Sequence, residues 1–209
     1  MRHLIHTIYK ALIYSKIAIL HKIFTFFFKF RLWLNNIAYG KNLKTFNAIP
    51  SLQINRNAKK VRFGNNVLFN AYTGHSWNSN NKILVKESAI LTIGDNSGMN
   101  GCMLFCSVSI IIGNNVKIGG GTRIFDTDFH SLDYQKRRNI ETDFSFAKCA
   151  PIIIEDDVFI GAGCFIGRGI TIGSRSIIAA GSVVVRSIPA DEVWGGNPAK
   201  FIKKITSVH

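Results

Sequence analysis

Apolar residues recur every six positions over much of the chain. Shorter runs of this kind start at Ile93 and at Ile112, and weaker echoes begin at Phe63. A period of six fits neither the 3.6-residue repeat of an amphipathic helix nor the alternation of a half-buried strand. The longest run consists of Ile154, Ile160, Ile166, Ile172, Ile178 and Val184; the shorter runs are Ile112, Ile118 and Ile124, and Ile93, Met99 and Phe105, and the echoes are Phe63 and Phe69.

This spacing predicts a triangular solenoid in which each hexapeptide forms a short strand and a turn. Three hexapeptides make one coil, so anchors eighteen residues apart stack on one another. One repeat cannot bury its own apolar face, and the coils must therefore stack to form a core. Glycine follows several anchors, as in Ile160-Gly161, and we expect glycine or a small polar residue to allow the turn. The expected stacks are Ile154 on Ile172, Ile160 on Ile178, and Ile166 on Val184.

The first 35 residues differ from the repeats. They are rich in Ile, Leu and Phe, have no Pro or Gly before Gly40, and so predict helix. No uncharged run reaches the ~20 residues that span a bilayer, and no signal-peptide cleavage site follows. Two compatible interpretations stand level. The segment lies on the inner face of the cytoplasmic membrane, held by apolar burial and anionic lipid, or it caps the core as a pair of helices or packs between subunits. Its basic residues spread around the helical wheel: Arg2, Lys10, Lys16, Lys22, Lys29 and Arg31.

Charge and cysteine content narrow the class of protein. The chain has 26 Lys and Arg against 12 Asp and Glu, a formal charge of +14. That excess calls for an anionic partner, but no nucleic-acid recognition motif accompanies it, so we expect no nucleic acid. The four cysteines match no common zinc or redox spacing, which predicts free thiols in a reducing cytoplasm. Cys164 falls within the apolar repeat and is expected to act as a small hydrophobe.

The tandem hexapeptides and the tail Gly195-Gly196-Asn197-Pro198-Ala199-Lys200-Phe201-Ile202-Lys203-Lys204-Ile205 together resemble the hexapeptide-repeat acyltransferases. The resemblance is to the galactoside/maltose O-acetyltransferase branch, including enzymes that acetylate surface polysaccharides, and it covers about residues 60–205. It implies a left-handed parallel β-helix, a homotrimer with active sites between subunits, and acetyl-CoA as co-substrate with no metal. We therefore expect an N-terminal helical segment over 1–40, an all-β solenoid over 41–190, and a CoA-contacting tail with a short helix over 191–209.

The repeat halts between Ile124 and Ile154, leaving a loop over 125–151 that contains His130. Acyl transfer to a hydroxyl needs a base, and histidine suits that role near neutral pH. The resemblance places the catalytic histidine of the family at this position. A carboxylate on the other ring nitrogen fixes the tautomer. Asp126 and Asp128 are both candidates for this carboxylate, and ordinary turn chemistry explains them equally well.

The resemblance also assigns CoA and acceptor contacts. Thr is common in the family where this chain has Val185, so no hydroxyl contact is expected there. The acidic acceptor-binding residue of the galactoside branch is missing, since Ser107 and Val108 stand in its place, which argues against free galactosides. The implied contacts are the backbone of Ala162 near the thioester, Ala180 on the pantetheine arm, Val185 and Arg186 in the next turn, Lys200 and Lys203 at the phosphates, and Asn100 at the acceptor.

The predicted function is O-acetylation of a sugar or surface-glycan precursor. N-acylation of an amino sugar nucleotide, antibiotic O-acetylation and a non-catalytic scaffold are the alternatives. A zinc lyase of the carbonic anhydrase kind needs three histidines on neighbouring coils, and only His75 and His130 lie within the repeats. Tyr72, His75 and Trp77 form a polar-aromatic segment, which is interpreted either as an exposed loop or as a sugar-stacking surface.

Overall fold

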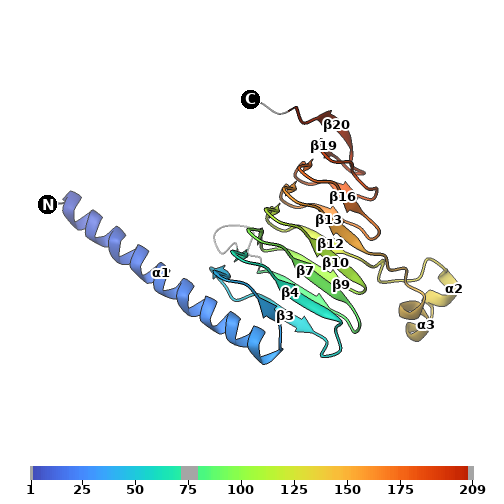
Figure 1. The fold of residues 1–209 in the computed structure, drawn as a ribbon, viewed down its shortest axis with the longest axis horizontal. Helices are drawn as coiled ribbons and strands as arrows, with labels where there is room; N and C mark the ends of the chain where they lie inside the picture. The colour runs from blue at the N-terminus through green and yellow to red at the C-terminus, as the bar shows by residue number, and fades with distance from the viewer. Residues whose placement is uncertain (1, 72–79, 207–209) are drawn as a thin grey trace.

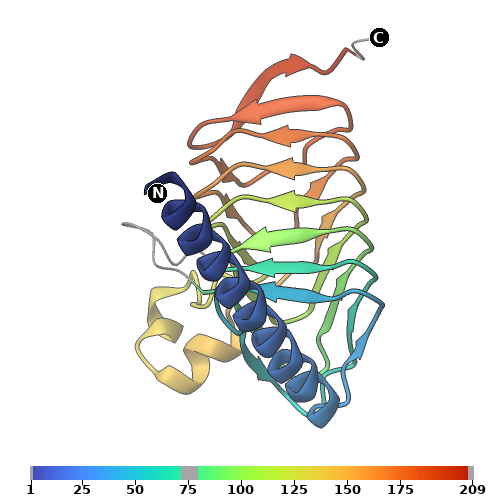
Figure 2. The ribbon, with the colours of Figure 1, turned by 90° about the vertical axis from the view of Figure 1, so that its left-hand side faces the viewer.

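The computed structural model describes residues 2–71 and 80–206, and these form one long helix followed by a triangular column of strands (Figure 1). The helix is α1 (Arg2–Leu34). The strands form three sheets, one along each side of the column, and Figure 2 shows their stacked rungs. Within each sheet the strands pair in parallel, except that β19 and β20 pair antiparallel.

From β1 to β18 successive strands belong to successive sheets, so the chain winds around the column, and β19 and β20 both join the second sheet. The first sheet contains β1 (Ala38–Tyr39), β4 (Lys60–Phe63), β7 (Ile90–Ile93), β10 (Ser109–Ile112), β13 (Ile152–Ile154) and β16 (Thr171–Ile172). The second contains β2 (Lys44–Phe46), β5 (Leu68–Asn70), β8 (Gly98–Asn100), β11 (Lys117–Ile118), β14 (Phe159–Ile160), β17 (Ile177–Ile178), β19 (Glu192–Gly195) and β20 (Lys200–Lys204). The third contains β3 (Ser51–Ile54), β6 (Lys82–Val85), β9 (Met103–Cys106), β12 (Arg123–Phe125), β15 (Phe165–Ile166) and β18 (Val183–Val184).

The six-residue anchors point into the column, as the period predicts. The anchors of the longest run are at most 1% exposed, and the predicted stacks are in register. Phe63 and Phe69 are also fully buried. The coils start earlier than the repeat suggested, because β1 begins at Ala38 and already pairs with β4. The core is therefore continuous from the first coil to the last.

One predicted anchor is wrong. Phe105 is half-buried and faces outward, whereas Leu104 is fully buried and pairs with Ile124 of the next coil. Leu104 comes five positions after Met99, instead of the six that the period requires. Because side chains alternate across a strand, that one-residue shortening turns Phe105 to the outer face.

The glycines after the anchors serve close packing rather than the turn conformation we expected. A Cβ on Gly161 would lie 2.5 Å from the backbone nitrogen of Ala180 in the next coil, so no larger residue fits. The left-handed turn conformation falls instead on asparagines at one corner, such as Asn96 and Asn115 with φ of 57°, and on glycines that do not follow an anchor, such as Gly163 with φ of 68°. Asparagine tolerates this region better than most residues. The coils are thus stacked tightly on glycine, while asparagine provides many of the turns.

The C-terminal half of α1 closes the open end of the column. Phe28 and Leu32 are fully buried, and the Phe28 ring packs edge-on against Phe69 with centroids 5.3 Å apart. The backbone N–H of Thr45 in the edge strand β2 donates to Thr25 Oγ1 at 3.0 Å. Covering the unpaired end of a solenoid prevents edge-to-edge association. The cap is a single helix rather than the expected pair.

The tail does not form the predicted short helix. Residues Lys200–Lys204 form β20, which folds back on β19 and caps the other end of the second sheet. The three cysteines within the repeats, Cys102, Cys106 and Cys164, are buried free thiols, and Cys149 is an exposed one. The interpretation of Cys164 as a small hydrophobe is confirmed.

Candidate active site

A long excursion interrupts the column between β12 and β13. It carries two short helices, α2 (Tyr134–Arg137) and α3 (Ile140–Ser145), and projects from the column on the side away from α1 in Figure 1. Its two arms are joined at the base, where Asp128 N–H donates to the Lys148 carbonyl at 3.0 Å and Ala150 N–H to the Asp126 carbonyl at 3.0 Å. The excursion is therefore an ordered structure fixed to the coil.

His130 lies on this excursion and pairs with a carboxylate of α3. Its Nδ1 is 2.6 Å from Oδ2 of Asp143, while Oδ1 of Asp143 accepts the backbone N–H of Ser131 at 2.7 Å. Arg137 donates to the Ser131 carbonyl at 2.6 Å and closes the turn. The His130 side chain is 61% exposed and that of Asp143 only 9%. The imidazole thus faces outward from a buried carboxylate that orients it, which leaves Nε2 toward solvent.

The surroundings of Asp143 favour its ionised form. The hydrogen bond with His130 holds the pKa of the Asp143 carboxyl below its ordinary value, and the Ser131 N–H and Arg137 charge act in the same direction against partial burial. An ionised carboxylate accepts a hydrogen bond from a protonated Nδ1 and stabilises the positive charge of an imidazolium ring. The pair therefore has the arrangement of a histidine base and its orienting acid.

A strained turn sets the direction of His130. Its N–H donates to the Asp128 carbonyl at 2.8 Å, closing a three-residue turn around Phe129, whose φ is 63°. That conformation is unfavourable for a bulky residue. The Phe129 ring packs edge-on against Phe105 and Phe125, with centroids 4.6 and 5.2 Å away. Edge-on aromatic pairs contribute roughly 0.5–1.5 kcal/mol each beyond their burial, which offsets the strain.

Asp126 does not orient His130, contrary to one of the sequence-based expectations. It is fully buried, and its carboxylate accepts the backbone N–H groups of Ser107, Val108 and Ser109 at 2.6–2.8 Å. Burial raises the pKa of the Asp126 carboxyl, and these three N–H groups oppose that rise. Its role is to fasten the start of the excursion to the turn of the preceding coil.

Asp128 is also engaged elsewhere, so the second expectation for the orienting carboxylate is wrong too. Its Oδ1 lies 2.7 Å from Nε of Arg168, which comes from the following coil. The ion pair borders a pocket of about 460 Å³ beside the base of the excursion. Phe125, Phe129 and Phe165 line this pocket together with Val185. The structure therefore brings Asp128 and Val185 together near the His130 turn.

The other predicted contacts lie at a different corner of the column. Asn100 ends β8, and Ala162 and Ala180 follow β14 and β17, so all three lie where the chain turns from the second sheet into the third. Gly121 N–H donates to the Asn100 carbonyl and Gly181 N–H to the Ala162 carbonyl, so successive turns stack. Ala162 and Ala180 are exposed and Asn100 is half-buried. His130 lies at the corner between the third and first sheets, so one chain does not bring these residues to the imidazole.

The basic candidates lie toward the C-terminal end. Arg186 follows β18 at the same corner as the excursion, and Lys200 and Lys203 lie on β20; all three are exposed. Tyr72, His75 and Trp77 lie outside the described residues. Among the described residues, no three His, Cys, Asp or Glu side chains lie close enough together to hold a metal ion.

Asp143 is the candidate site residue that sequence reasoning missed. It lies thirteen positions after His130, too far along the chain for a local turn to join them. The sequence contains a helix-capping residue at Asn139, whose side chain accepts a hydrogen bond from the N–H of Glu141 at the start of α3. That signal predicts a short helix carrying Asp143, but the fold of the excursion is needed to place this helix against His130.

Comparison with known proteins identifies the repeat. The family described as "Hexapeptide repeat of succinyl-transferase" matches residues 151–186. The Saccharomyces cerevisiae protein named "Putative acetyltransferase YJL218W" is 40% identical over 115 residues, 54% of this chain and 56% of that protein. Gamma carbonic anhydrase 2 of Arabidopsis thaliana is 34% identical over 51% of this chain and 40% of that protein.

A solved structure agrees with the fold. The hexapeptide-repeat-containing acetyltransferase of Vibrio cholerae is 39% identical, covers 56% of this chain and 64% of its own, and superposes with a TM-score of 0.51. The chain spans about half the length of the curated relatives it matches. The predicted resemblance and the left-handed parallel β-helix are thus confirmed, while the activity of the whole protein is not carried over by these partial matches.

Proposed function

We propose that this chain, which carries the repeat and the left-handed parallel β-helix of the hexapeptide-repeat acyltransferases, transfers an acetyl group from acetyl-CoA to a sugar hydroxyl. The acceptor class is a sugar or a surface-glycan precursor. The observation that carries the proposal is the exposed His130 imidazole held by buried Asp143 at the break in the repeat. The acetyltransferase similarity of the relatives supports the reaction class.

The proposed reaction is a direct transfer. Asp143 accepts a hydrogen bond from the Nδ1–H of His130, which leaves Nε2 without a proton. Nε2 then takes the proton of the acceptor hydroxyl while the hydroxyl oxygen attacks the thioester carbonyl. Backbone N–H groups stabilise the oxyanion. Collapse of the tetrahedral intermediate breaks the carbon–sulfur bond, and the imidazolium returns its proton to the departing CoA thiolate.

None of the three buried cysteines acts as a nucleophile in this scheme. Burial raises the pKa of the Cys102 and Cys106 thiols to about 12, which keeps them protonated. Burial also raises the pKa of Cys164. Only the thiolate is a strong nucleophile, so these residues serve packing.

A homotrimer would complete the site. Asn100, Ala162 and Ala180 stack along one corner of the column, and His130 projects from another. A cyclic arrangement places one corner of each copy against a different corner of its neighbour. In such an assembly the backbone at Ala162 and Ala180 binds the acyl and pantetheine parts of acetyl-CoA, Lys200, Lys203 and Arg186 bind its phosphates, and Asn100 binds the acceptor.

The test uses purified full-length protein, acetyl-CoA and a panel of nucleotide sugars, amino sugars and lipid-linked sugars. We expect release of CoA thiol and a product about 42 mass units heavier, because an acetyl group replaces one hydrogen of the acceptor. An O-acetyl ester is lost in mild base, whereas an N-acetyl amide survives. His130→Ala should lower turnover by about 10²–10⁴-fold while the oligomer and CoA binding persist.

Two outcomes would contradict the proposal. A base-stable product would identify an N-acyltransferase instead. Near-normal turnover in His130→Ala would remove this imidazole from the reaction.

A further inference from the structure

The net positive charge of the chain comes entirely from its first part. Residues 1–86 contain 14 Lys and Arg and no Asp or Glu, since Glu87 is the first acidic residue. The remaining residues contain 12 basic and 12 acidic side chains. The whole net charge of +14 therefore belongs to α1 and the first coils. The proposed CoA contacts lie in the neutral part and do not account for it.

The exposed face of α1 is apolar. Four large apolar residues follow each other at intervals of seven, which places them on one face of the helix. Phe28, which is buried in the cap, lies two residues and about 200° around the helix from Phe26, so this face points away from the column. Its residues are Leu12, Ile19, Phe26 and Trp33, exposed by 64%, 58%, 65% and 69%.

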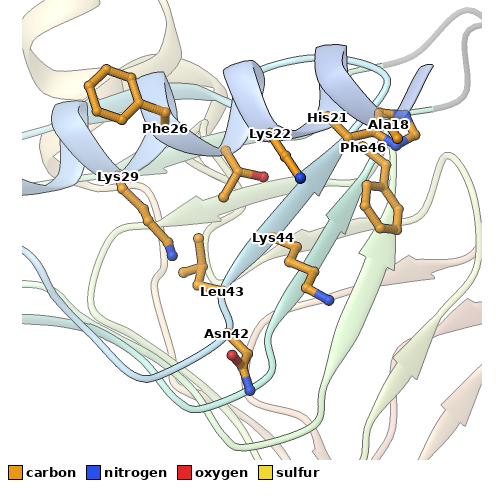
Figure 3. Close-up of a pocket in the computed structure, with 10 residues that line it drawn as sticks. Ala18, His21, Lys22, Phe26, Lys29, Asn42, Leu43, Lys44 and Phe46 are labelled. Atoms are coloured by element: carbon orange, nitrogen blue, oxygen red, sulfur yellow. The ribbon is translucent and has the colours of Figure 1, made fainter. Parts of the chain in front are cut away.

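Lysines flank this apolar face at the junction of α1 and β2. Figure 3 shows the groove between them, with Lys22 and Lys29 reaching from α1 toward the strand that carries Lys44. The groove holds about 610 Å³, and Leu43 and Phe46 form its apolar floor. No acidic side chain in the first coils competes for these ammonium groups.

We infer that α1 and the groove bind the surface of an anionic lipid bilayer. The face formed by Leu12, Ile19, Phe26 and Trp33 enters the boundary between headgroups and acyl chains. Lys22, Lys29 and Lys44 bind the headgroup phosphates. This inference does not depend on the proposed acyl transfer.

Lipid fits this surface better than a second copy of the chain does. In a cyclic oligomer, equivalent elements lie at the same level along the axis. The apolar face of α1 would then meet α1 or the first coils of a neighbour, which carry only basic charge. Like charges at such a contact repel, whereas phosphate headgroups attract.

The helix lies along the membrane rather than across it. By length and composition Tyr9–Leu34 is long enough to span, and it is the one such helix among the described residues. Five basic residues are spread along it, however, so a spanning helix would hold charge near the bilayer centre, which is costly. Its C-terminal half also packs on the column through Phe28 and Leu32, and spanning would break that cap.

The first experiment sediments the full-length protein with vesicles of phosphatidylcholine alone or with 30% phosphatidylglycerol. We expect at least about tenfold stronger partitioning onto the anionic vesicles, falling several-fold in 0.5 M salt. Lys22→Gln/Lys29→Gln/Lys44→Gln should reduce that partitioning about tenfold or more.

The matched control removes the same charge from the neutral part of the chain, as Lys117→Gln/Lys148→Gln/Lys204→Gln. We expect less than about a twofold change, because these exposed lysines lie far along the chain from α1. Equal losses in both triple variants, or binding to an oligonucleotide but not to the vesicles, would overturn the inference.

A second measurement reads the position of the helix. An environment-sensitive fluorophore is attached at Leu12→Cys or Phe26→Cys in a Cys149→Ser background, which removes the exposed native thiol. These sites share a face and lie about 21 Å apart along the axis. We expect both labels to shift to the blue only with anionic vesicles and to report the same shallow depth. Different depths would indicate a spanning helix, and a blue shift without vesicles would indicate packing on another copy; either result overturns the inference.

Discussion

At the scale of single residues, the site depends on which atom Asp143 presents to which neighbour. One carboxylate oxygen contacts His130 Nδ1 and the other accepts the Ser131 N–H. A carboxylate is suited to both contacts because each oxygen is an acceptor. Asparagine has the same shape but only one acceptor oxygen. Replacing Asp143 with asparagine therefore removes one hydrogen-bond acceptor while leaving the packing of the side chain unchanged.

We predict that Asp143→Asn lowers turnover by on the order of 10²–10³-fold with little change in acetyl-CoA affinity. If the amide oxygen stays with Ser131, the NH₂ group faces Nδ1 and moves the ring proton to Nε2, which can then no longer accept a proton. Steady-state kinetics measures the split between kcat and KM. Asp133→Asn is the control, because Asp133 caps α2 in the same excursion without touching the imidazole. Equal losses in both variants would mean that Asp143 only keeps the excursion folded.

At the scale of elements, the excursion acts through the strained turn at Phe129. Removing the ring in Phe129→Ala removes the edge-on contacts with Phe105 and Phe125 that offset the unfavourable φ. We predict a loss of turnover of roughly 10- to 100-fold through misplacement of His130, with an unchanged melting temperature of the column. Phe146→Ala is the control, since Phe146 is exposed on the same excursion. Wild-type turnover in Phe129→Ala would show that the turn holds without the aromatic contacts.

The sequence predicts elements well where a local rule repeats and poorly where the chain folds on itself once. The anchors from Ile154 to Val184 follow from a period that holds without interruption over these residues. The prediction that Phe105 is an anchor is wrong because the spacing is shorter by one residue there, which turns its side chain to the outer face of the strand. The period alone gives no sign of this shortening. The pairing of His130 with Asp143 fails for another reason: it depends on how α3 packs, a non-local contact that occurs only once in the chain.

At the scale of the whole molecule, stability comes from stacked anchors that run the length of the column. Ile166 is fully buried and pairs with Ile124 on one side and Val184 on the other. An unpaired carboxylate there costs several kcal/mol, comparable with the ~5–15 kcal/mol that keep a domain folded. We predict that Ile166→Asp fails to fold, as measured by circular dichroism and thermal melting. Ile153→Asp, on the outer face of β13 in the first sheet, should melt nearly like wild type; a normally melting Ile166→Asp would reject the inward assignment.

Stability in acid is also a property of the whole molecule, because carboxyl groups in separate parts of it have pKa values that are lowered in the folded state. Hydrogen bonds from Asn65 hold the pKa of Asp95 below its ordinary value, and Arg175 does the same for Asp191. Asp143 is the third of these groups. A carboxyl with a lowered pKa in the folded state contributes stability above its unfolded pKa of about 3.9. That contribution is lost as the pH falls through the lower folded values.

We therefore predict a melting temperature that changes little between pH 7 and pH 5 and falls steeply below about pH 4. Asp126 opposes this trend, since burial raises its pKa and protonation relieves that cost, so the fall measures the balance of all four groups. In Asp191→Asn the contact with Arg175 no longer titrates, and the fall below pH 4 should become shallower while the melting temperature at pH 7 drops. Calorimetry across pH compares Asp191→Asn with the wild type, and Glu87→Gln, at an exposed carboxylate outside these three pairs, is the control. An unchanged acid slope in Asp191→Asn would show that the ion pair adds nothing to the pH dependence, and a melting temperature that rises below pH 4 would show that Asp126 dominates it.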